Sequence, residues 1–362
     1  VCKLLSIMAA LALWDDLRHG LKCYTGPRNR VACSLARAAA PTPQTQFPVT
    51  MTHGLVDIGA NLLDPMFKGV YREKSRHPAD LSAVLFRARQ AGVTRIMVTA
   101  GSLQESRDVL QLCQQSLSEG DWPQLCCTVG VHPTRCSEFD ESGSPAKHMH
   151  ELRDAALSAG SFLCAIGECG LDYDRLEFCP REVQKEYFEK QLKELAIPMR
   201  KPLFLHCRTS EAAEDLLALL RKHQKDLPQN PGVVHSFDGS YEDAAKFISL
   251  GFFIGLNGCS LKTEENLAMV RSLPDDCILL ETDAPWCGIK ASHAGHDFVR
   301  STWDEVKKPE RWEEGKCVKD RCEPCQMRQV LEVVAGCRSM SPEALAKVVL
   351  QNSNKFMGTT AS

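Results

Sequence analysis

The sequence has no long hydrophobic run. Its longest apolar stretch near the start, residues 4–14, is about half as long as a helix that spans a bilayer. Internal repeats and low-complexity tracts are also missing, so no repeat architecture is indicated. We therefore expect no transmembrane helix and no membrane partner.

The sequence also has no excess of basic residues. Its formal net charge is −3, and residues 1–50 carry +4, so the remainder of the chain carries −7. Non-specific binding of duplex DNA depends mostly on Lys and Arg that neutralise phosphates. The acidic body excludes a broad DNA-wrapping surface, and any nucleic acid would bind locally, with cations supplying positive charge.

The 18 cysteines show no spacing typical of a small disulfide-stabilised domain. This favours reduced, buried thiols in an intracellular protein. Separately, we expect the protein in the nucleus, the cytoplasm or both. Cys322-x-x-Cys325, with Cys317 nearby, leaves a zinc or redox interpretation open. No second C-x-x-C or H-x-H motif stands at the spacing of a zinc site, which weakens that interpretation.

Residues 1–50 differ from the rest of the chain. They combine a short apolar stretch with basic, Ala/Ser/Pro-rich sequence, which is typical of a signal-like or organellar leader. The chain does not begin with Met, and Met51 precedes the patterned region, so an artefactual or isoform-specific extension fits equally well. We expect 1–50 to be a disordered extension and 51–362 to be one folded domain.

From residue 55 onward, short β-rich runs alternate with helical patterns, as in parallel βα units. Leu81, Val84, Leu85 and Ala88, for example, recur with helical spacing. The predicted strands cover residues 55–62, 95–101, 125–133, 162–172, 202–208, 232–239, 252–258 and 277–286. Because no G-x-G-x-x-G motif follows the first of them, we predict a TIM-type (β/α)8 barrel and not a dinucleotide-binding fold.

One segment, 288–324, shows no convincing periodicity. It is longer than ordinary connections, and it would form a lid or a substrate-binding loop at the active-site face of a barrel. Trp303 and Trp312 stand there among eight Lys/Arg, a combination that suits base stacking beside phosphate contacts. Eight Asp/Glu in the same segment leave a solvated, salt-bridged loop equally open.

Four candidate metal ligands fall near the ends of predicted strands. A lone His or carboxylate there is usually structural, but the carboxyl ends of barrel strands converge on one bowl. Two imidazoles and two carboxylates would meet in that bowl and bind a cation. The four residues are Glu168 on the fourth strand, His206 on the fifth, His235 on the sixth and Asp283 on the eighth.

Such a set suits metal-activated hydrolysis, in which cations lower the pKa of water and stabilise the leaving oxygen. Glu168 would act as a carboxylate shared between cations, and Asp283 would bind metal and take the proton from the attacking water. Arg208 and Arg135 are candidates for binding a phosphate oxygen. His132, at the rim of the third strand, would bind phosphate or be structural.

Six sequence blocks, in this order, resemble the signature of the TatD family of metal-dependent DNases. They are residues 56–62 (VDIGANL), 129–133 (VGVHP), 165–172 (AIGECGLD), 205–208 (LHCR), 234–239 (VHSFDG) and 281–286 (ETDAPW). The resemblance covers nearly all of the chain after the leader, and its closest likeness is to an animal group within the family. It implies an amidohydrolase-type barrel in which Glu168, His206, His235 and Asp283 match the family's ligand positions.

The resemblance also implies an activity. Family members remove nucleotides from 3′ ends of DNA or cut at damaged sites, so we expect a monomeric 3′-to-5′ exonuclease on single-stranded or damaged ends, with a role in DNA repair or degradation. Two alternatives stay open. One is another metal-dependent hydrolase of phosphoester or C–N bonds, and the other is a weakly active scaffold protein.

Two departures from the family pattern bear on the metals. Many members carry Asp-x-His-x-His on the first strand, whereas this chain has Asp57, Gly59 and Asn61 there. Asp57 and Asn61 are at most weak ligands or supporting groups, so we expect one or two ions, Mg²⁺ or Mn²⁺ in preference to Zn²⁺. In the other departure, Cys322 replaces the Asn of an Arg-Asn-Glu-Pro block, which would tune or weaken the site.

Overall fold

The computed structural model describes residues 52–358. The extension predicted at 1–50 lies outside the described residues. Among the helices of 52–358, none combines the length and the apolar composition needed to cross a bilayer.

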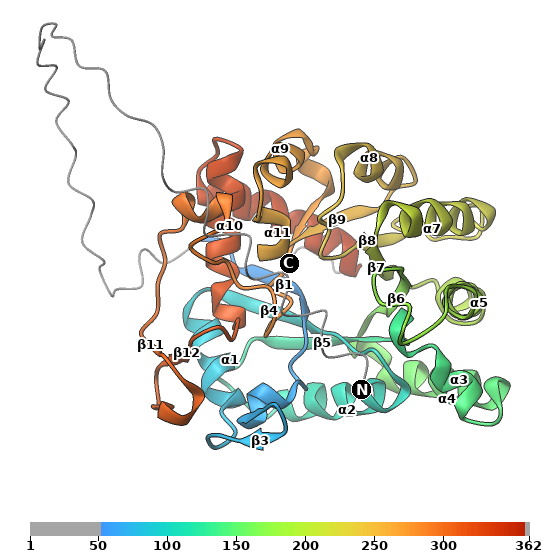
Figure 1. Ribbon diagram of the computed structural model, residues 1–362, viewed down its shortest axis with the longest axis horizontal. Helices are drawn as coiled ribbons and strands as arrows, with labels where there is room; N and C mark the ends of the chain where they lie inside the picture. Colours follow the sequence, from blue (N-terminus) through green and yellow to red (C-terminus); the bar gives the residue numbers. More distant parts are fainter. Residues whose placement is uncertain (1–51, 359–362) are drawn as a thin grey trace, which may run out of the picture. The chain divides into compact units, whose positions relative to one another are not determined.

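Eight parallel strands form one closed sheet (Figure 1). The strands are β1 (Leu55–Ala60), β4 (Val93–Val98), β5 (Gln124–Val129), β6 (Leu163–Asp172), β7 (Leu203–Arg208), β8 (Gly232–Val234), β9 (Phe253–Leu256) and β10 (Ile278–Leu280). The first and last strands join through hydrogen bonds from Asn61 N to Ala284 O (2.7 Å) and from Asp283 N to Gly59 O (2.8 Å). The predicted barrel is confirmed.

Helices follow the strands and cover the outside of the barrel (Figure 1). They are α1 (Leu81–Gln90), α2 (Leu103–Ser116), α3 (Ser137–Glu141), α4 (Pro145–Ala159), α5 (Arg181–Gln191), α6 (Ile197–Met199), α7 (Ser210–Lys222), α8 (Tyr241–Ser249), α9 (Glu264–Ser272), α10 (Met327–Cys337) and α11 (Pro342–Met357). At the start of α2, Ser102 accepts a hydrogen bond from Glu105 N, whereas the Glu105 carboxylate accepts one from Gly101 N. Glu105 thereby orders the chain between β4 and α2.

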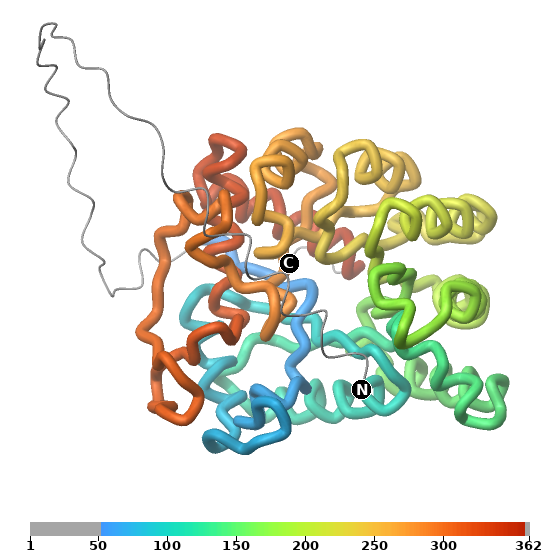
Figure 2. Tube along the Cα trace, in the orientation of Figure 1, coloured from blue at the N-terminus to red at the C-terminus, as the bar shows by residue number. Residues whose placement is uncertain are grey.

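The core has two layers. Residues on one face of each strand pack against the helices, and one or two residues from every barrel strand form a separate cluster, including Ile58 and Phe204. Because side chains alternate between the faces of a strand, this second cluster fills the barrel interior. Phe356 and Met357 of α11 belong to it, and Figure 2 shows the red end of the chain beside the blue first strand.

Some of the predicted strands extend past the carboxyl ends of the observed strands. The sixth was predicted to reach residue 239 and the eighth residue 286, but β8 ends at Val234 and β10 at Leu280. The backbone leaves the extended conformation just afterwards, because Ser236 has φ 49° and Asp283 has φ 50°. Positive φ is costly for residues other than glycine, and it is a feature of functional sites. His235 and Asp283 therefore stand on loops just beyond the strands.

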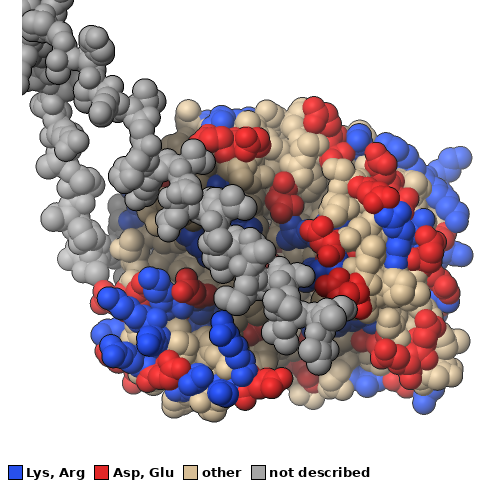
Figure 3. Space-filling model, in the orientation of Figure 1, with Lys and Arg blue, Asp and Glu red and all other residues tan. Residues whose placement is uncertain are grey.

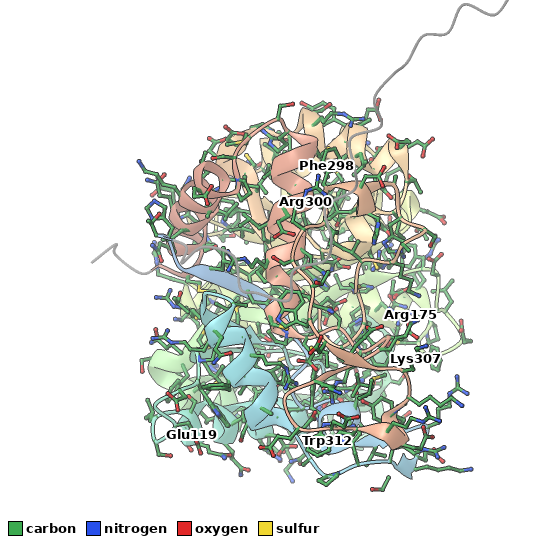
Figure 4. All side chains as sticks on the ribbon, turned by 90° about the vertical axis from the view of Figure 1, so that its left-hand side faces the viewer. Glu119, Arg175, Phe298, Arg300, Lys307 and Trp312 are labelled. Carbon is green, nitrogen blue, oxygen red and sulfur yellow. The ribbon has the colours of Figure 1, made fainter. Side chains whose placement is uncertain are left out.

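The segment 288–324 contains short regular elements, which the sequence did not indicate. These are two 3₁₀ helices, η7 (Ala294–Phe298) and η8 (Pro309–Arg311), and the paired strands β11 (Glu305–Val306) and β12 (Cys317–Val318). Trp312, labelled in Figure 4, stacks on His77 and donates from Nε1 to Asp80 Oδ2 at 2.9 Å. Trp303 packs against the buried cluster of Ala91, Cys317 and Cys325. Both tryptophans are engaged in packing near α1, so they support the structural interpretation of this loop.

A buried ion network fixes the end of this segment to α1. Arg321 donates to both Asp80 oxygens (2.8 and 2.7 Å) and to Glu323 Oε1 (2.8 Å). Arg87 of α1 donates to both oxygens of Glu323 (2.9 and 3.1 Å). The side chains of Arg321 and Glu323 have no exposed surface, so each charge depends on its partners for solvation.

Glu323→Ala should destabilise the protein because it leaves Arg87 and Arg321 buried with less compensating charge. We expect a loss of about 3–5 kcal/mol in the free energy of unfolding, measured by urea denaturation. Glu151→Ala, which removes a partly exposed partner of Arg107, is the matched control and should change little. Equal stability of the two variants would contradict a structural role for the network.

Candidate metal centre

A cavity of about 620 Å³ opens where the strands end at their carboxyl termini. Of the nine residues predicted for the site, all except Asp57 line it. These eight are Asn61, His132, Arg135, Glu168, His206, Arg208, His235 and Asp283. The remaining lining residues, which the sequence did not single out, include Glu105, Arg175, Trp286 and Cys287.

Glu168 is the residue on which the site converges. Its Oε1 lies 2.9 Å from His206 Nδ1, 2.8 Å from His235 Nε2 and 3.3 Å from His132 Nε2. Glu168 and His206 are held on β6 and β7, and His132 and His235 follow β5 and β8. Several imidazoles around a single carboxylate oxygen are a donor set that suits a divalent cation.

Among the described residues, three groups of side chains have ligand atoms close enough to hold a cation, and two of these groups lie at this site. The ligand atoms of Glu168, His206 and His235 lie within 4.8 Å of one another, and so do those of His132, Asp172 and His206. Asp283 lines the same cavity but belongs to neither group. The residues that fit a cation position here are therefore Glu168, His206 and His235, and Asp283 stands beside them in the cavity.

Each of the two ligand histidines has a second carboxylate behind it. His206 Nε2 lies 2.9 Å from Asp172 Oδ2, and His235 Nδ1 lies 3.4 Å from Glu281 Oε1. A carboxylate on the far nitrogen fixes the ring orientation and leaves the other nitrogen free to bind metal. Sequence reasoning missed both roles, although Asp172 and Glu281 stand in the same blocks as Glu168 and Asp283.

Burial and charge set the proton affinities of this cluster. Burial alone would raise the pKa of Glu168, but His235 and His132 outweigh it and hold this pKa well below its usual range. Burial likewise opposes a charged His235, yet Glu168 and Glu281 raise its pKa well above normal. Burial lowers the pKa of His132 to about 4. Without metal, the pair carries Glu168⁻ and His235⁺, while His132 stays neutral.

Asp283 is held by a donor on each oxygen. Asn61 Nδ2 donates to Oδ1 at 2.8 Å, and the Cys287 thiol donates to Oδ2 at 3.1 Å. Thr99 in turn donates to Asn61 Oδ1 at 2.6 Å, which fixes the amide. Burial raises the pKa of Asp283 to about 6, with His235 opposing the shift. Asn61 thus supports Asp283 and does not point a free oxygen at the cavity.

The packing around the first strand leaves no room for a histidine side chain at position 59. A Cβ atom on Gly59 would lie 2.9 Å from both Glu281 Oε2 and Phe204 Cζ, so neighbours already fill the space of a side chain there. Asp57 is fully buried and accepts hydrogen bonds from Thr282 N (2.9 Å) and Thr282 Oγ1 (2.5 Å). Asp57 lies outside the cavity and supports the residue next to Asp283.

Three arginines surround the cavity mouth, and each is paired with a carboxylate. Arg135 donates to Glu105 Oε1 (2.5 Å), and Arg208 pairs with Asp238 at 2.7 Å. Arg175, labelled in Figure 4, donates to the buried Asp172 carboxylate. Trp286 stands at the same mouth with 57% of its surface exposed. The mouth therefore places three guanidinium groups, each paired with a carboxylate, beside an aromatic face.

The thiols of the C-x-x-C motif face different groups. Cys322 Sγ donates to the Thr282 carbonyl at 3.8 Å, whereas Cys317 and Cys325 face Glu323 Oε2 at 3.6 and 4.0 Å. Glu323 already accepts hydrogen bonds from two guanidinium groups, whose charge opposes a cation. The ligand atoms of Cys317, Glu323 and Cys325 nevertheless lie within 4.8 Å of one another, whereas Cys322 contacts the backbone beside Asp283. The zinc interpretation stays a prediction for the first three residues.

Residues 56–358 match the family model described as TatD related DNase. The chain is 43% identical over 302 residues to the protein named Deoxyribonuclease Tat-D from Schizosaccharomyces pombe, covering 82% of this chain and 93% of that protein. It is 31% identical over 306 residues to the protein named 3′-5′ ssDNA/RNA exonuclease TatD from Dickeya dadantii, covering 83% and 97%. A solved TatD family hydrolase from Entamoeba histolytica is 32% identical with a TM-score of 0.78, covering 86% and 100%.

Cation affinity should rise with pH. A cation must displace the proton that the raised pKa keeps on His235, and below about pH 6 it must also displace one from Asp283. Each displaced proton costs about tenfold in apparent affinity per pH unit. Calorimetric titration with Mn²⁺ should therefore show a steeper pH dependence below about pH 6 than above it.

Asp283→Asn should remove only the steeper part of this pH dependence, since an amide does not titrate. Affinity for Mn²⁺ that does not change between pH 5 and 8 would contradict the assignment of these groups to the metal centre.

Proposed function

Because the chain belongs to the TatD-related DNase family, we propose that it is a divalent-cation-dependent deoxyribonuclease that removes nucleotides from the 3′ ends of single-stranded DNA. The observation that carries the proposal is the convergence of three imidazoles on Glu168 Oε1 at 2.8–3.3 Å. A hydrolase of this class needs a site that binds cations next to a space for a phosphodiester, and the cavity offers both.

We propose Mg²⁺ or Mn²⁺ as the cation of this centre. When bound, such a cation neutralises phosphate charge and makes water a better nucleophile. Glu168, His206 and His235 would hold the first ion, and Asp283 would hold the second, looser one. Gly59 supplies no ligand and Asn61 is engaged with Asp283, so the second position relies on oxygen donors, which Mg²⁺ and Mn²⁺ prefer.

Asp283 is the candidate general base. Its raised pKa of about 6 lies closer to neutrality than that of an ordinary carboxylate, which suits proton transfer. As the oxygen of the attacking water bonds to phosphorus, a proton of the water passes to Asp283. The ester P–O bond breaks, and the leaving oxygen takes a proton from solvent to become a hydroxyl group. Asn61 and Cys287 hold the carboxylate in place by one hydrogen bond to each oxygen.

The arginines at the cavity mouth are candidates for phosphate binding. Arg135, Arg175 and Arg208 are paired with carboxylates, and a phosphate would take over part of these contacts. His132, neutral because of burial, would donate to or accept from the substrate. Exposed Trp286 would stack on a base, which suits an unpaired strand better than a duplex.

The charge distribution supports local binding of a strand end. In Figure 3, acidic and basic side chains are interspersed over the visible face, with basic ones gathered over β3 (Lys74–Ser75) and the β11–β12 loop. Where Figure 3 shows the described residues of this face, acidic side chains interrupt the basic ones, which suits a strand end better than a duplex. We propose a monomer that acts in the nucleus or cytoplasm in DNA repair or degradation, which fractionation and repair assays would test.

Glu168→Ala should lower DNase activity by roughly 100-fold or more, because the carboxylate that organises the imidazoles is lost. The assay uses single-stranded oligonucleotides labelled at the 5′ end, with Mg²⁺ or Mn²⁺, and resolves the product ladder. The wild type should shorten the strand from its 3′ end. Glu151→Ala, a Glu→Ala change on the exposed face of α4, should keep full activity. DNase activity of Glu168→Ala equal to that of the wild type would contradict the proposal.

A further inference from the structure

Two cysteine thiols meet at the edge of the candidate metal centre. Cys259 Sγ and Cys287 Sγ lie 3.0 Å apart, although the residues are separated by 28 positions in the chain. Cys259 stands in η5 (Gly258–Leu261), directly after β9, and Cys287 stands in the loop after β10. Cys287 lines the cavity, and its thiol donates to Asp283 Oδ2 at 3.1 Å.

The backbone brings these loops together. A Cβ atom on Gly258 would lie 2.0 Å from the Cys287 carbonyl oxygen, so only glycine permits this approach. Asn257 fixes the same turn because its Oδ1 accepts from Cys259 N at 2.8 Å and its Nδ2 donates to Glu281 Oε1 at 3.0 Å. The thiols are therefore neighbours because of fixed backbone contacts and not because of a chance rotamer.

The pair is also within reach of small solutes. Cys259 is half-buried, and Cys287 is buried but borders the open cavity. Another close pair, Cys126 and Cys164, belongs to the cluster inside the barrel and borders no described cavity of the site. Proximity and access thus coincide at Cys259 and Cys287.

We propose that Cys259 and Cys287 form a reversible disulfide that regulates the metal centre. With a hydroperoxide as oxidant, one thiol sulfur attacks a peroxide oxygen and becomes a sulfenic acid, releasing water or an alcohol. The second thiol then attacks this sulfur, the S–O bond breaks, and a second water leaves as the S–S bond forms. Two electrons and two thiol protons are removed, and the sulfurs need to approach by only about 1 Å.

Disulfide formation changes the surroundings of Asp283. A disulfide sulfur carries no hydrogen, so Asp283 Oδ2 loses the donor that the Cys287 thiol supplies. Only the Asn61 hydrogen bond to Oδ1 then holds the carboxylate. The expected result is lower nuclease activity that a dithiol reductant restores, and this consequence rests on the proposed function.

Peptide mapping under non-reducing conditions tests the bond itself. The full chain is treated with hydrogen peroxide, free thiols are alkylated, and the cross-linked peptides are identified by mass spectrometry. A Cys259–Cys287 peptide should appear in the wild type and in Cys277→Ser, which removes a different accessible thiol, but not in Cys259→Ser. The proposal is overturned if Cys259 and Cys287 both remain alkylatable, or if they link to other cysteines.

DNase assays after removal of peroxide by catalase test the consequence. Oxidation should lower the activity of the wild type and of Cys277→Ser, and dithiothreitol should restore it, while Cys259→Ser should resist the oxidant. A mapped disulfide with unchanged activity would overturn the regulatory link. If reduced wild type shows no DNase activity at all, the proposed function fails, whereas the mapping result still decides whether the disulfide forms.

Discussion

Three imidazoles lie around one carboxylate oxygen, Glu168 Oε1, and the surrounding residues have to balance the charges of this buried cluster. A buried carboxylate with several imidazoles is stable only when the charges are paired or a cation replaces the protons. The barrel meets this demand by placing Asp172 behind His206 and Glu281 behind His235. Carboxylates therefore lie on both sides of the imidazoles, and this arrangement suits a cation better than a neutral ligand.

The residues that close the barrel also form part of the candidate site. The hydrogen bond from Asp283 N to Gly59 O joins the last strand region to the first, and Asp283 also lines the cavity. Glu281 Oε2 and Phe204 fill the space beside Gly59. The packing around Gly59 therefore leaves no space for a histidine side chain. Asn61 occupies the position of the second histidine in many family members, and here it holds Asp283.

The sequence predicts much of this arrangement and misses parts that depend on three dimensions. The strands follow from the β-rich runs, and the meeting of the four candidate ligands in one cavity follows because parallel strands place their carboxyl ends on one rim. The supporting roles of Asp172 and Glu281 could not be distinguished, since motif position does not say which carboxylate faces a ring nitrogen. Trp312 suggested base stacking, but its packing on His77 is decided by tertiary contacts. The Cys259–Cys287 contact depends on an approach of two loops that spacing does not reveal.

The central claim is that Glu168, His206 and His235 form the firm cation position. Anomalous diffraction from crystals grown with Mn²⁺, recorded on both sides of the manganese edge, tests it most directly. We expect a strong anomalous peak bounded by Glu168 Oε1, His206 Nδ1 and His235 Nε2, and a weaker or partial peak beside Asp283. Crystals with no peak at Glu168, or with manganese held only elsewhere, would contradict it.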